Sequence, residues 1–102
     1  MESAFNSNLT DAVVGVPRNV VYRDFAAETV LLNIETGMYH GLNPVAGRML
    51  EALDRLGSVR EAVTLLAQEF EQPADVIERD LTGLCEGLLQ RGLLEVRPAA
   101  DA

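Results

Sequence analysis

The segment Leu31–Pro44, with the sequence LLNIETGMYHGLNP, places the strongest constraint on the fold. Residues 28–34 are rich in β-branched and aliphatic side chains and indicate a strand. Residues 35–37 end in a glycine of the kind that closes a short hairpin loop, and residues 38–42 form a brief returning strand. Asn43 followed by Pro44 marks a helix start. The segment therefore predicts a β-hairpin that runs directly into a helix.

A three-residue loop fixes the pairing that we expect across this hairpin. The expected pairs are Ile34 with Met38, Leu32 with His40, and Val30 with Leu42. Because side chains alternate along a strand, these six residues share one face, which we predict to be the core face. The other face then carries Leu31, Asn33, Tyr39 and Gly41.

The rest of the chain predicts one more strand and three helices. Residues 18–25 indicate the first strand of the sheet, and apolar spacing predicts a helix over 44–56 that ends at Gly57. Ser58 and Glu61 form a capping box for a second helix, whose buried stripe reaches Phe70. A third helix covers about 74–91, and residues 93–96 either add a short closing strand or cover the core. Strands followed by helices predict an α+β fold.

A chain of 102 residues forms one domain. We expect a flexible N-terminal lead-in at 1–15, the domain at 16–96 and a C-terminal tail at 97–102. No signal peptide, membrane span or disulfide pair is indicated, so we expect a cytoplasmic protein.

Charge excludes several classes of partner. The net charge is −8, and all eight basic residues are arginines scattered along the chain. Binding to nucleic acid or to an anionic membrane surface needs a concentrated basic patch, so we expect neither partner. One histidine and one cysteine far apart in sequence do not make a zinc site, so we expect no metal and no cofactor.

The sequence also offers few candidates for catalytic residues. His40 is the one histidine, and nothing local places a nucleophile or an orienting carboxylate beside it. Cys85 lies on the apolar stripe of the third helix, where a small buried hydrophobic residue is the simplest interpretation. We therefore predict no catalytic residues and no enzyme.

The strand at 38–42 ends the sheet, so one of its sides has no neighbouring strand. Such an edge is either harmless, because it is short, or it accepts an extended peptide as an additional strand. The third helix would then form a wall of the groove. Its Gly83 and Gly87 let a guest approach closely, although packing of the helix on the sheet would explain them equally well.

The order of these features resembles the PqqD-like family. The resemblance rests on VLLNIETGMYHGLNPVAGRMLEAL, SVREAVTLLAQEFE and VIERDLTGLCEGLLQRGLLEV, and it covers about Val16 to Val96. Members of this family are small winged helix-turn-helix domains, also called RiPP recognition elements. They bind leader segments of ribosomally made precursor peptides. The resemblance implies a three-stranded antiparallel sheet followed by three helices, with the leader added beside the third strand.

The resemblance also implies a set of peptide-binding residues on the third strand and the third helix. By position these are Met38, Tyr39, His40, Gly41, Leu42, Val76, Asp80, Leu81 and Leu84. Which face of the helix lines the groove stays open at this point.

The NIETGMYHGLN segment is most similar to the free-standing leader-binding proteins of lasso peptide clusters, which present the leader to a separate leader peptidase. The alternative within the family is a PqqD-type chaperone for a radical SAM enzyme. Two further alternatives are a winged-helix DNA-binding module and a dimerisation module that pairs its free edge with a second copy. The balance of charges on the third helix does not favour DNA.

Overall fold

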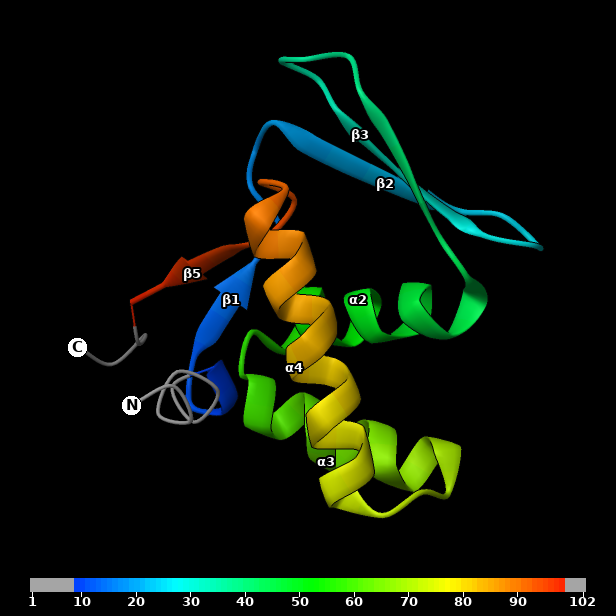
Figure 1. The fold of residues 1–102 in the computed structure, drawn as a ribbon, viewed down its shortest axis with the longest axis vertical. Coiled ribbons are helices and arrows are strands. Elements are labelled where there is room, and N and C mark those ends of the chain that lie inside the picture. Colours follow the sequence, from blue (N-terminus) through cyan, green and yellow to red (C-terminus); the bar gives the residue numbers. More distant parts are fainter. Residues whose placement is uncertain (1–8, 99–102) are drawn as a thin grey trace.

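The fold is known from a computed structural model, which describes residues 9–98 (Figure 1). Three antiparallel strands form a sheet in the order β2-β3-β4, so β3 is central. The strands are β2 (Val20–Asp24), β3 (Thr29–Asn33) and β4 (Tyr39–Leu42). The helices that follow are α2 (Pro44–Leu56), α3 (Val59–Phe70) and α4 (Ala74–Gln90). The predicted α+β fold is confirmed.

Local capping signals set the helix starts. The side chain of Asn43 accepts a hydrogen bond from the amide of Ala46 at 2.8 Å, and Pro44 occupies the first helical turn. The Ser58 hydroxyl accepts one from the amide of Glu61 at 3.1 Å at the start of α3. Gly57, between the two helices, has a φ of 77°, a backbone conformation that favours glycine.

A second, two-stranded sheet ties the two ends of the described chain together. It pairs β1 (Val13–Gly15) with β5 (Glu95–Arg97), with Val14 opposite Val96. A closing strand was one of the two outcomes expected for the end of the domain. Its partner lies within the expected lead-in, where Leu9 and Val14 are buried in the core. The packed part of the chain thus begins before residue 16, and residues 1–8 lie outside the described range.

The core lies between the sheet and the three helices. Its largest fully buried side chains come from β3 and from every helix, and they include Leu31, Leu50, Leu53, Leu66, Leu81 and Leu88. Leu56, in the last turn of α2, is 38% exposed. Gly47 of α2 approaches β3 closely, since a Cβ there would lie 2.1 Å from Oγ1 of Thr29.

The predicted register of the β3–β4 hairpin is wrong by one residue. Leu32 lies opposite Tyr39 and Leu31 opposite His40, so the loop contains residues 34–37 rather than 35–37. The cause is Asn33: its side-chain oxygen accepts hydrogen bonds from the amides of Glu35 and Thr36. Its carbonyl also accepts one from Gly37.

This shift exchanges the two faces of β3, because side chains alternate along a strand. Leu31 is fully buried in the core, whereas Val30 and Leu32 lie on the outer face. The expected core positions of Ile34 and Met38 are also wrong, since both side chains are exposed. His40 and Leu42 do lie on the core side, as predicted.

Candidate functional site

The outer edge of β4 presents backbone groups that no strand within residues 9–98 bonds. The amide of Asn33 donates to the carbonyl of Met38 at 3.0 Å, so this pair is hydrogen-bonded across the hairpin. Antiparallel pairs alternate between bonded and non-bonded, so His40 and Leu42 face β3 while Tyr39 and Gly41 direct their N–H and C=O outward. Within residues 9–98, β4 has β3 as its one sheet neighbour, and these outward groups have no partner.

The side chains of this edge alternate between the two faces of the sheet. Tyr39 is 68% exposed on the outer face, and Met38, just before the strand, is 57% exposed. His40 is half-buried opposite Leu31, and Leu42 is buried. The expected strand residues therefore combine apolar surface with free backbone donors and acceptors, which is what strand addition requires.

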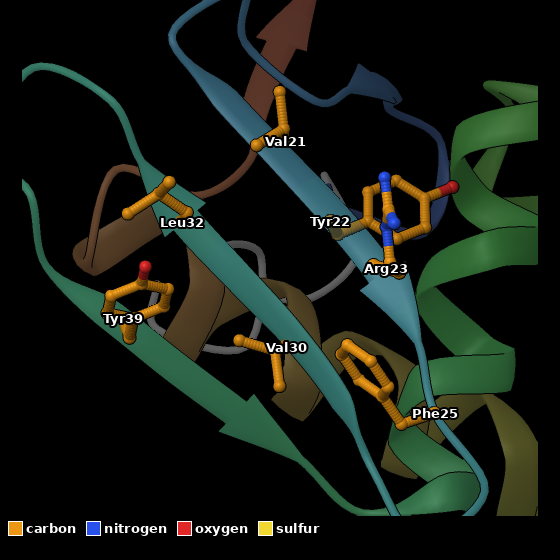
Figure 2. Close-up of a pocket in the computed structure, with 7 residues that line it drawn as sticks. All are labelled: Val21, Tyr22, Arg23, Phe25, Val30, Leu32 and Tyr39. Carbon is orange, nitrogen blue, oxygen red and sulfur yellow. The ribbon is translucent and has the colours of Figure 1, made fainter.

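The outer face of the sheet carries a shallow hollow of about 180 Å³ (Figure 2). Figure 2 shows Val21, Leu32 and Tyr39, from the three strands, on the face turned away from the helices. The other residues that line it are Tyr22, Arg23, Phe25 and Val30. The predicted register placed Val30 and Leu32 in the core, so this apolar surface was missed. The Asn33 side chain, which sets the loop, was the signal that would have found it.

The expected wall residues on α4 divide between core and surface. Leu81 is fully buried, so it has no surface that a peptide could touch. Val76 and Leu84 are half-buried and Asp80 is exposed. At helical spacing these three lie on one stripe with Gly83 and Gly87, beside the buried face of α4.

The packing of residues 9–98 does not require the two glycines of this stripe. A Cβ added at Gly83 or at Gly87 would meet nothing within 4 Å among the described residues. Close packing of the helix on the sheet, which was one explanation for them, is therefore wrong. Both glycines border open space.

Cys85 is buried, and its burial raises the pKa of the thiol to about 11, so the reactive thiolate is scarce at neutral pH. Among residues 9–98, no three His, Cys, Asp or Glu side chains come together as metal ligands would. None of the helices in this range is long and apolar enough to span a membrane.

A small α+β domain with an open strand edge is the class of protein that these features define. The sequence profile described as PqqD: Coenzyme PQQ synthesis protein D matches residues 28–94, and the chain belongs to this family. No curated protein matches the chain.

Two solved structures share the fold. One is described as "TbiB1 in Complex with the TbiA(beta) Leader Peptide". It is 29% identical to this chain, with a TM-score of 0.74, and the match covers 83% of this chain and 99% of that one. The other is described as "Lasso peptide synthetase B1 complexed with the leader peptide", with 24% identity, a TM-score of 0.73, and coverage of 82% and 99%. These matches agree with the fold that the sequence resemblance implied.

Proposed function

We propose that the chain is a recognition protein that binds the leader segment of a ribosomally made precursor peptide. The leader adds as a fourth strand beside β4 and is presented to a processing enzyme, a lasso peptide leader peptidase. The observation that carries the proposal is the outward row of backbone groups at Tyr39 and Gly41. Supporting it, the 29% identical TbiB1 is described as a complex with a leader peptide.

Backbone bonding alone gives too little affinity. Tyr39 and Gly41 each offer one donor and one acceptor, and each bond contributes about 1 kcal/mol net. Association costs about 4–15 kcal/mol, so apolar anchors of about 1.5–3 kcal/mol each must supply the remainder. Met38 and Tyr39 expose suitable surface at the edge itself.

We further propose that α4 forms the opposite wall of the groove through Val76, Asp80 and Leu84. Leu81 then supports the wall from within the core rather than touching the leader. Gly83 and Gly87 lie on the same stripe, and the open space beside them leaves room for the guest. His40 and Leu42 face the core side of the sheet, where they form the floor between strand and helix.

The test uses a labelled synthetic leader taken from the precursor gene beside the gene for this chain. Fluorescence polarisation is expected to show saturable binding. In hydrogen exchange by NMR, the amides of Tyr39 and Gly41 are expected to exchange quickly in the free protein and slowly in the complex. The His40 amide, which faces β3, is expected to be protected in both states and serves as the internal control. Binding without new protection at Tyr39 and Gly41 would place the leader elsewhere and contradict the proposal.

A further inference from the structure

The outer face of the sheet is arranged in rows that end at the free edge. Val21, Leu32 and Tyr39 lie directly opposite one another across the three strands and form an apolar row. The next row consists of Arg23, Val30 and Gly41. A fourth strand beside β4 would extend both rows by one side chain each, because directly opposite residues share a face.

The second row ends at Gly41, and the Glu28 carboxylate lies over the space where a side chain of residue 41 would be. Gly41 has no side chain, and Oε1 of Glu28 lies 2.8 Å from the position that a Cβ on Gly41 would take. Glu28 is exposed, and its side chain makes no hydrogen bond or ion pair within residues 9–98. Within residues 9–98, a carboxylate without an ion-pair partner therefore lies over the outermost position of the row that begins at Arg23.

We propose that Glu28 is a specificity-determining residue that selects a Lys or Arg at the leader position opposite Gly41. This inference rests on the proposed function, because it needs a guest strand at β4. The guest side chain opposite Gly41 points to the outer face, meets no Cβ from Gly41, and lies beside the Glu28 carboxylate. A long basic side chain fills the gap and pairs with the carboxylate, whereas an acidic one is repelled.

The neighbouring row adds a second condition. In an antiparallel guest, the residue opposite Tyr39 follows two positions after the one opposite Gly41, on the same face. An apolar side chain there would extend the row of Val21, Leu32 and Tyr39. The preferred guest therefore carries a basic residue, any residue, and then an apolar residue.

The test is a selection of random linear peptides displayed on phage against the immobilised full chain. The bait proteins are the wild type, Glu28→Lys, Gly41→Pro and Glu71→Lys. Glu71→Lys is the matched control, because it makes the same change in charge at an exposed residue that directly follows α3. Figure 1 shows α3 at the end of the molecule away from the three-stranded sheet. We define edge binders as the peptides that the wild type retains and Gly41→Pro does not. Circular dichroism checks that every bait is folded.

On the wild type and on Glu71→Lys, edge binders are expected to be enriched in Lys or Arg two positions before an apolar residue. On Glu28→Lys, Asp or Glu is expected to replace the basic residue. For a selected peptide, Glu28→Gln is expected to weaken binding by about two- to fivefold, the range for an exposed ion pair.

Two results would overturn the inference in distinguishable ways. If edge binders show no basic preference, or keep it on Glu28→Lys, the role of Glu28 is refuted while edge binding stands. If Gly41→Pro retains the same peptides as the wild type, the edge itself is not used and the proposed function fails as well.

Discussion

The three-stranded sheet has two outer strands, and both leave backbone groups without a strand neighbour within the described chain. On β2, the amide of Val20 donates to the carbonyl of Pro17, and the Tyr22 hydroxyl donates to Asp54 of α2 at 2.8 Å. The strand also carries the charged residues Arg23 and Asp24. The β4 strand consists of Tyr39, His40, Gly41 and Leu42 and contains no Asp, Glu, Lys or Arg.

Charged residues and proline are the usual means by which a protein protects an exposed sheet edge from further pairing. The β2 edge carries two charged residues, its Tyr22 side chain is bonded to α2, and its Val20 amide is bonded to the turn before it. The β4 strand carries no Asp, Glu, Lys or Arg. The contrast supports the choice of β4 over β2 as the edge for the guest strand in the proposed function.

A pair of proline substitutions at outward-facing amides tests the difference between the β4 and β2 edges most directly. Gly41→Pro removes a donor at the β4 edge and leaves a guest carbonyl unpaired, which costs about 2 kcal/mol or more and corresponds to about a 30-fold loss of leader affinity. Asp24→Pro removes the equivalent donor at the β2 edge and is expected to leave affinity unchanged. Fluorescence polarisation measures both, after thermal unfolding has shown that each variant is folded. Equal losses in the two variants would contradict the distinction between the edges.

A pair of glycine substitutions tests whether packing is tight beneath the sheet and loose beside α4. In Gly47→Ala the new Cβ would meet Thr29, so we expect a loss of about 1–3 kcal/mol in the free energy of unfolding. In Gly87→Ala nothing lies within 4 Å, and the better helix propensity of alanine is expected to stabilise the chain by up to about 1 kcal/mol. Urea denaturation measures both changes. If the two variants changed stability in the same direction, the assignment of open space beside α4 would be wrong.

The hydrogen bond between Tyr22 of β2 and Asp54 of α2 makes stability depend on alkaline pH. Burial raises the pKa of Tyr22 above its ordinary value near 10, and the hydrogen bond to Asp54 raises it further. The folded protein thus holds this proton more tightly than the unfolded chain does. The resulting stability is fully present below about pH 10 and is lost as the pH rises above that value.

Tyr22→Phe removes this contribution, so we expect a loss of about 0.5–1 kcal/mol at neutral pH and a shallower decline in stability above about pH 10 than in the wild type. Leader affinity is expected to stay the same, because Tyr22 belongs to the β2 edge. Denaturation across the alkaline range checks the first point and fluorescence polarisation checks the second. An identical alkaline decline in both proteins would show that Tyr22 is not the group responsible.

Sequence reasoning predicted the helices well because their signals are local. Asn43 with Pro44, Ser58 and Gly57 each act within one turn of the residue that they cap or stop, so their effect can be read without knowing the fold. The order of strands and helices followed from the same kind of signal. The expected family and fold followed from that order.

The hairpin register depended on a side chain whose role is less visible in a sequence. Asn33 was expected to be an ordinary strand residue, but its side chain bonds the loop amides and lengthens the loop by one residue. That single change inverted the predicted faces of β3 and hid the outer apolar row. The pairing of β1 with β5 joins residues that are far apart in the chain, and no local pattern specifies such a partner.

The pairing of β1 with β5 also has a practical consequence. Val13 lies directly opposite Arg97, so the first and last strands of the described chain run side by side. In Figure 1 this two-stranded sheet lies apart from the outer strand β4. A purification tag, a fluorophore or a tethered enzyme that follows β5 would therefore be anchored at the β1–β5 pair and not at β4.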